Sequence, residues 1–201
     1  MTQPARGLLR RPPHRRPHGP ARRLPRRLLL ALLTATAISR VDPSRAEVYR
    51  QPRDFIAGAG GQPDSPAFLL QRRPLQQRVE AVLGHPYRTL RVRYWPGVGI
   101  TIWVLDEIGK EEDITIGFVI RDRAIAATEV LVFRESRGWE IRYPAFTRQF
   151  IGATLVDGSA LDRNIDGITG ATLSVGAYER MARVALLFDA EVRERNDVHG
   201  R

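Results

Sequence analysis

The stretch Asp166-Gly167-Ile168-Thr169-Gly170-Ala171-Thr172-Leu173-Ser174 lies directly before a long helical pattern. Apolar residues then recur at spacings of three and four, at Val175, Tyr178, Ala182, Ala185 and Leu186. This spacing predicts an amphipathic helix that continues to about Glu194. We therefore expect Thr172 in the first turn of the helix.

The residue types around Thr172 suit a bulky anionic group. Gly170 and Ala171 leave the backbone uncovered, and the free N–H groups of a helix start favour a phosphate. Asp166 is the only acidic residue of the stretch and is expected in a loop. An ordinary helix start is the alternative, with Thr169 or Thr172 as the N-cap and Asp166-Gly167 as a turn.

The segments upstream of this stretch predict a small sheet. Two short helices are expected over Pro74–Leu83, ending at Gly84, and over Pro144–Ile151. Four segments have strand character: Thr89–Trp95, Gly99–Leu105, Ile114–Ile120 and Ile125–Phe133. The sequence thus predicts one small α+β domain over residues 74–195, an antiparallel sheet with flanking helices and a long C-terminal helix.

The sequence also indicates the character of the segment before the domain and of the connections between its strands. Residues 47–73 are rich in Gly, Pro and polar residues, which predicts an irregular lead-in to the domain. The charged residues of 107–113 are interpreted as a solvated turn, and Asp122-Arg123 as the turn between two strands.

The basic charge of the chain is concentrated at its N-terminus. The formal net charge is +10, but residues 1–53 contain 13 Arg and only 2 acidic residues. The rest of the chain has 19 basic and 20 acidic residues, so it is nearly neutral. Binding to a phosphate backbone requires a basic face on the folded domain. We therefore expect no nucleic-acid partner.

Residues 1–46 have the pattern of a targeting segment. A basic region with Arg22, Arg23, Arg26 and Arg27 precedes the apolar run 28–38, and small residues follow near Ala46. The apolar run is shorter than the roughly 20 residues of a typical spanning helix. A signal peptide is therefore predicted, with an uncleaved signal anchor as the alternative. Either places the domain in the periplasm or at the outer face of the cytoplasmic membrane.

The chain contains no cysteine, which excludes disulfides, Cys-ligated clusters and thiol catalysis. His85 is the one histidine of the expected domain before its C-terminal end, and it is interpreted as a loop residue. No metal ligands are expected. Redox chemistry would therefore require a bound organic cofactor.

Five positions, Asp166, Thr169, Gly170, Ala171 and Thr172, resemble the flavinylation motif Asp-x-x-(Ser/Thr)-Gly-Ala-Thr of the FMN-binding domain family. That family includes the subunits that carry covalent FMN in the Na⁺-translocating NADH:quinone reductase and in the related Rnf complex. The resemblance implies FMN joined covalently, through its phosphate, to Thr172. Ser174, just after the motif, is expected to serve the helix start beside the cofactor.

The resemblance covers roughly residues 110–190. Residues 116–120 and 126–132 resemble the family's β-hairpin, and residues 133–139 resemble its Glu-containing loop, although Ser-Arg-Gly replaces Thr-Pro-Gly after Glu135. Glu135 is expected either to orient this loop or to be solvated. Trp139 and Phe150 are expected either near the isoalloxazine ring or in the core.

The function implied by the resemblance is electron transfer by an exported flavoprotein. Its partners would be an exported flavin transferase for maturation and a redox protein of the cell envelope. Two alternatives remain. One is a binding or regulatory module that holds FMN non-covalently or not at all. The other is a flavin-dependent reductase with its own substrate.

Overall fold

The computed structural model describes residues 46–199, so the predicted targeting segment lies outside the described residues except for Ala46. The strands are β1 (Glu47–Val48), β2 (Ala67–Leu70), β3 (Arg91–Gly97), β4 (Ile100–Ile108), β5 (Asp113–Arg121), β6 (Ala124–Phe133), β7 (Leu155–Val156) and β8 (Ala160–Leu161). The helices are α1 (Pro52–Gly58), α2 (Arg73–Leu83), α3 (Pro144–Thr147) and α4 (Thr172–His199), with 3-10 turns η1 (Trp139–Arg142) and η2 (Arg148–Phe150).

The central element is a six-stranded sheet in the order β1-β6-β5-β4-β3-β2, in which every pair of neighbours is antiparallel. Asp122 and Arg123 join β5 to β6 and have φ angles of 49° and 63°. Left-handed conformations at both positions match the right-handed twist of a tight hairpin. This confirms the predicted turn.

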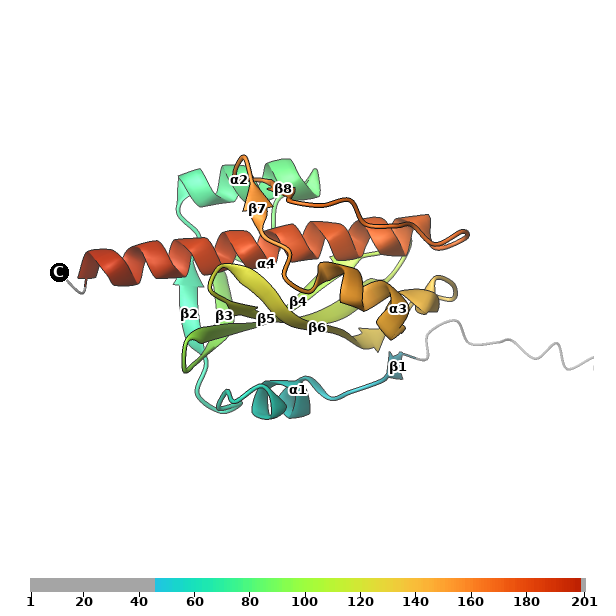
Figure 1. The fold of residues 1–201 in the computed structure, drawn as a ribbon, viewed down its shortest axis with the longest axis horizontal. Helices are drawn as coiled ribbons and strands as arrows, with labels where there is room; N and C mark the ends of the chain where they lie inside the picture. Colours follow the sequence, from blue (N-terminus) through green and yellow to red (C-terminus); the bar gives the residue numbers. More distant parts are fainter. Residues whose placement is uncertain (1–45, 200–201) are drawn as a thin grey trace, which may run out of the picture. The chain divides into compact units, whose positions relative to one another are not determined.

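The two faces of the sheet are covered unequally. Helix α4 crosses one face with α2 beside it, and α1 lies on the opposite side (Figure 1). On the α1 side a small cluster gathers Phe55, Ile56, Trp95, Ile102 and Val119 with their neighbours. Because α1 has only seven residues, it covers only part of its face. These layers confirm the predicted α+β class.

Helix α4 is buried more widely than its predicted stripe. From Ala177 to Phe188, most residues are buried, because the sheet and α2 contact different sides of the helix. Asp189 is also fully buried, where Thr101 Oγ1 donates to its carboxylate at 2.6 Å and Arg193 Nε at 2.8 Å. A buried carboxylate is tolerated when hydrogen bonds satisfy it. The middle of α4 is therefore a structural core.

The segment 47–73 is more ordered than expected. It contributes β1 and β2 to the two edges of the sheet, and α1 between them. Its Gly- and Pro-rich composition is confined to the connections, whereas Phe55, Ile56 and Leu69 are buried. The sheet therefore begins near residue 47. Within residues 46–199, no helix is long and apolar enough to cross a membrane.

Candidate functional site

The motif stretch forms the loop that leads into α4. Gly170 has a φ of +86°, a left-handed conformation that glycine adopts readily, and a Cβ there would meet nothing within 4 Å. The carbonyl of Ala171 accepts the first backbone bond of the helix, from Val175 N at 2.9 Å. Ala171 is therefore the N-cap, so neither Thr169 nor Thr172 is the ordinary side-chain cap that the alternative interpretation required.

The first turn of α4 leaves its donors free. Within the described chain, the N–H groups of Thr172, Leu173 and Ser174 have no backbone acceptor, and no hydrogen bond involves the Thr172 hydroxyl. Thr172 is exposed. Free amides at the start of a long helix carry partial positive charge and favour an anion. The helix start therefore has three amides without a backbone acceptor and one exposed hydroxyl.

A cavity of about 520 Å³ opens in front of this turn, and we call it the motif pocket. Its walls combine the helix start with two segments from elsewhere in the chain: Lys110, Glu135, Ser136, Arg137, and residues 170–174. Lys110 comes from the β4–β5 turn, and Glu135–Arg137 follow β6. The fold thus brings Glu135 into the same cavity lining as Thr172 and Ser174.

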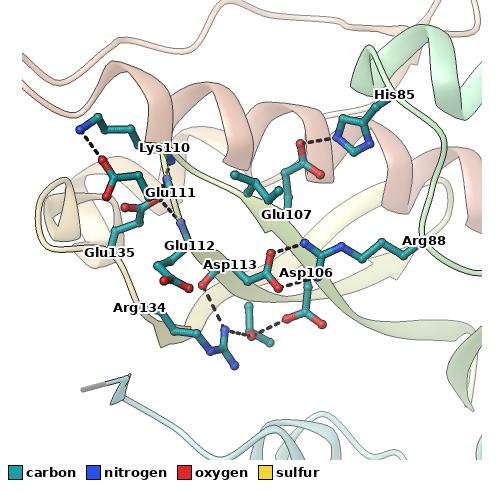
Figure 2. Close-up of polar contacts among 12 residues, drawn as sticks. His85, Arg88, Asp106, Glu107, Lys110, Glu111, Glu112, Asp113, Arg134 and Glu135 are labelled. Atoms are coloured by element: carbon teal, nitrogen blue, oxygen red, sulfur yellow. Dashed lines mark hydrogen bonds and ion pairs between the residues drawn. The ribbon is translucent and has the colours of Figure 1, made fainter. Parts of the chain in front are cut away.

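Glu135 holds the β4–β5 turn in place. Its Oε1 accepts hydrogen bonds from the backbone N–H groups of Lys110, Glu111 at 2.7 Å and Glu112 at 2.9 Å (Figure 2). A carboxylate that accepts several amides fixes the conformation of a turn. Glu135 therefore orients the β4–β5 turn, whereas the sequence led us to expect that it would orient its own loop, residues 133–139, or be solvated.

The loop after Glu135 packs tightly on the helix start. Gly138 has a φ of +87°, and a Cβ there would lie 2.3 Å from Ser174 Oγ. Only glycine fits both the conformation and the space. Ser174 is buried by this contact, so it supports the wall of the motif pocket.

The motif pocket is positively charged at its rim. Lys110 and Arg137 line it, and Lys110 Nζ pairs with Glu111 at 2.7 Å, a hydrogen bond that raises the pKa of the Lys110 ammonium. The sequence did not single out either residue, because Lys110 lay within a charged run interpreted as solvent-exposed. Only the register of β4 and β5 brings this turn beside α4.

The charged run 107–113 is not simply a solvated turn. Glu107 is only 3% exposed, and its Oε1 accepts from Arg180 Nε at 3.0 Å and approaches His85 Nε2 at 3.2 Å. Glu107 belongs to the face of β4 that packs against α4, which explains its burial. His85 lies in the loop after α2, as predicted.

The two aromatic candidates lie outside the motif pocket. Phe150 is 0% exposed and stacks on Tyr178 with ring centroids 4.6 Å apart, so it is a core residue rather than a ring contact. Trp139 is 39% exposed at the start of η1 and packs edge-on against Tyr143. It follows Gly138 directly but does not line the pocket.

Side chains far from the motif hold its loop. Gln149 Oε1 accepts from Asp166 N at 2.7 Å, while the Asp166 side chain is exposed. Further upstream, Arg163 donates to the carbonyls of Ile151 and Gly152 at 3.1 and 3.0 Å. These contacts tie residues 163–166 to Gln149 in η2 and to the two residues that follow η2, and the sequence alone gave no signal for them.

Residues 109–187 match the family model of the FMN-binding domain. This segment is similar to the FMN-binding domain family. None of the curated proteins and none of the solved structures matches the chain. The match is to the family as a whole and points to no particular complex, and it supports FMN as the ligand of the domain.

The motif pocket fits the phosphate end of FMN. Three unsatisfied amides, the rim charges of Lys110 and Arg137, and the open space over Gly170 are what a phosphate requires. Leu173 is the one large apolar side chain of the pocket, and it is exposed. The pocket therefore supplies phosphate recognition, and little of it is apolar.

Proposed function

We propose that this protein is an exported electron carrier that holds FMN as a phosphoester on Thr172. The observation that carries the proposal is the Thr172 hydroxyl, exposed and without a hydrogen bond among the described residues, in a helix turn whose amides are also free. Thr172 is also the last residue of the flavinylation motif, the position at which FMN is attached in the family that the motif resembles. Bound FMN would supply one- and two-electron redox chemistry, which the cysteine-free chain lacks.

Different residues of the motif pocket would bind different parts of the FMN phosphate end. The amides of Thr172, Leu173 and Ser174 donate toward a phosphate group, and Lys110 and Arg137 offset its charge. Gly170 keeps the approach to Thr172 open. An ester on Thr172 Oγ1 requires loss of the hydroxyl proton, so a base must remove it.

The lining of the motif pocket offers one carboxylate for that step, and this carboxylate is already engaged in holding a turn. Glu135 is the only carboxylate of the lining, and its Oε1 already accepts three backbone amides. The activation of Thr172 is therefore assigned to a flavin transferase, which also provides the flavin as a diphosphate ester. The P–O–P bond of that donor breaks as the ester to Thr172 Oγ1 forms, and the second phosphate leaves with its own substituent. The exposed Asp166 carboxylate, whose backbone is fixed by Gln149, is available for recognition by that transferase.

Export and partners rest on the N-terminal sequence and the family resemblance. The basic and apolar pattern of residues 1–46 is typical of a secretion signal, and a tethered flavin cannot be lost by dilution outside the cytoplasm. The electron partner would be a redox protein of the cell envelope. A binding or regulatory module with no covalent flavin is the competing function.

The test is production of the full chain in a host with an exported flavin transferase. Wild-type protein should show flavin fluorescence in denaturing gels, and peptide mass spectrometry should locate FMN on Thr172. Thr172→Ala should remove this signal completely while the protein remains folded, because the side chain is exposed and makes no hydrogen bond within residues 46–199. Thr169→Ser is the matched control, because the motif accepts either hydroxyl at this exposed position of the same loop, and it should retain covalent flavin.

A chain lacking residues 1–46, kept in the cytoplasm of the same host, should stay unmodified. Covalent flavin in Thr172→Ala, or an adduct mapped to another residue, would contradict the assignment. Wild-type protein that binds FMN only reversibly would support the binding module instead.

A further inference from the structure

A second cavity lies on the opposite face of the sheet. It measures about 480 Å³ and lies where the short α1 leaves the sheet uncovered. We call it the α1-face cleft, and the lining residues used below are Arg91, Arg93, Asp106, Thr115 and Arg134. It shares no lining residue with the motif pocket.

The pleat of the strands directs these side chains to one face. Val92 is buried in the core beneath α4, so its neighbours Arg91 and Arg93 belong to the opposite face. On β4 and β5, Asp106 and Thr115 are direct cross-strand partners, and Thr115 Oγ1 donates to Asp106 Oδ1 at 2.5 Å. Residues from separate strands therefore meet at one place.

The guanidinium groups of the α1-face cleft have spare donors. Arg93 makes no side-chain hydrogen bond or ion pair with any residue between 46 and 199, and Arg91 only covers the ring of Phe68, 3.7 Å from its centroid. Arg134 donates through Nη1 alone, to Thr115 Oγ1 and Asp113 O at 3.0 Å each (Figure 2). Its Nε and Nη2 thus find no acceptor in the described chain.

The charge of the cleft is not balanced from within. Asp106 is the only acidic residue of the lining, and Arg53, the fourth arginine there, is already paired with Asp64. Arg91, Arg93 and Arg134 therefore exceed Asp106 by two positive charges. Arginine recognises carboxylate and phosphate groups through paired N–H donors. A volume near 480 Å³ lies within the usual range of small-molecule sites.

We propose that the α1-face cleft binds a small molecule with two or more anionic groups, carboxylate or phosphate. Arg134 is held by Thr115 and the Asp113 carbonyl, so it provides a fixed contact at the floor of the cleft. Arg91 and Arg93 close on the ligand from β3. The negative charge of Asp106 offsets part of the positive potential of the three arginines. A ligand with only one negative charge is therefore attracted less strongly than a ligand with two or more.

The experiment is isothermal titration of the full chain with pyrophosphate and with citrate at moderate salt. Arg93→Gln should weaken the better ligand about tenfold, the loss expected for one charge-assisted contact. Arg73→Gln is the matched control, because Arg73 is exposed on α2 and lines neither cavity. It removes the same charge and should leave the affinity within about twofold. Asp106→Asn should tighten binding a few-fold.

Preference for pyrophosphate identifies a phosphate ligand, and preference for citrate identifies a carboxylate ligand. Equal losses of affinity in Arg93→Gln and Arg73→Gln would show that the anion binds through the general basic charge of the protein, such as that of the N-terminal residues. That result would overturn the proposal. So would binding of a hexaglutamate peptide when neither small anion binds, since that outcome indicates a protein partner. The Arg93 side chain makes no hydrogen bond or ion pair within residues 46–199, so the circular dichroism of Arg93→Gln should match that of the wild type.

Discussion

Arg134 and Glu135 are neighbours in the chain, yet each lines a different cavity. Arg134 belongs to the α1-face cleft, which offers guanidinium groups from several strands. Glu135 belongs to the motif pocket, where the donors that face an anion are mainly backbone amides of one helix turn. Side-chain donors tolerate small shifts of the backbone, whereas amide donors do not. The motif pocket should therefore depend on backbone conformation, and the cleft on charge.

The largest effect that sharpens this comparison is expected at Gly138. In Gly138→Ala the added Cβ would lie 2.3 Å from Ser174 Oγ at a left-handed φ of +87°. The strain and the clash should together lower the free energy of unfolding by about 3 kcal/mol. Gly170→Ala is the matched control, because its φ is +86° but its Cβ meets nothing within 4 Å.

Gly170→Ala should lower the free energy of unfolding by only about 1–2 kcal/mol, from backbone strain alone. Urea unfolding of both variants gives the difference. Anion affinity of the α1-face cleft should be unchanged in either one. Equal losses of stability would show that Ser174 moves aside without penalty, so the wall of the motif pocket would not be rigid.

Features formed by residues close together in the chain could be predicted from the sequence. The motif stretch is local, so spacing and residue type were enough to place Thr172 in the first helical turn and Asp166 in a loop. The hairpin after Arg121 was equally visible, because strand alternation and a two-residue turn are short-range signals. The antiparallel character of the sheet and the long helix α4 were predicted from these elements.

Features made by residues far apart in the chain could not be predicted in this way. Lys110 reaches the motif pocket only through the register of β4 and β5, and Glu107 is buried only because α4 covers that strand face. By residue type, Phe150 and Trp139 were equally plausible contacts of the flavin ring. Their packing in the fold, against Tyr178 and Tyr143, shows that both lie outside the motif pocket. Segment 47–73 was predicted to be irregular from its composition. Composition does not reveal that β1 and β2 are edge strands, because they are stabilised by pairing with β6 and β3.

A smaller effect is expected from the carboxylate that holds the β4–β5 turn. Glu135→Ala leaves three backbone N–H groups without their acceptor, which should lower the free energy of unfolding by about 1–3 kcal/mol. The amides of residues 110–112 should exchange with solvent markedly faster. Glu111→Ala removes a nearby exposed carboxylate that pairs only with Lys110, and it should change neither stability nor exchange. Unchanged amide exchange in Glu135→Ala would mean that the turn is held by its strands alone.

The smallest effect should appear as a pH dependence in the loop that leads to the motif. The hydrogen bond from Arg163 is the main cause that lowers the pKa of Asp162 from 3.8 to about 2. Because the pKa is depressed in the folded state, the stabilisation is present above about pH 4 and is lost as the pH falls toward 2. Asp162 also accepts from Thr154 N at 3.3 Å, so its protonation loosens the contacts that tie residues 163–166 to η2 and to the two residues that follow it.

Asp162→Asn removes the titrating group, so the mutant should be slightly less stable than the wild type at pH 6 and nearly equal to it at pH 2. Other carboxylates also titrate in this range, among them Asp64, whose pKa is lowered by Arg53. Only the difference between the two proteins therefore reports on Asp162, and it is obtained from urea unfolding at matched pH values. A difference that stays constant from pH 6 to pH 2 would show that the Asp162 charge does not hold the loop. The backbone bonds between Thr154 and Asp162 would then be sufficient to position the motif.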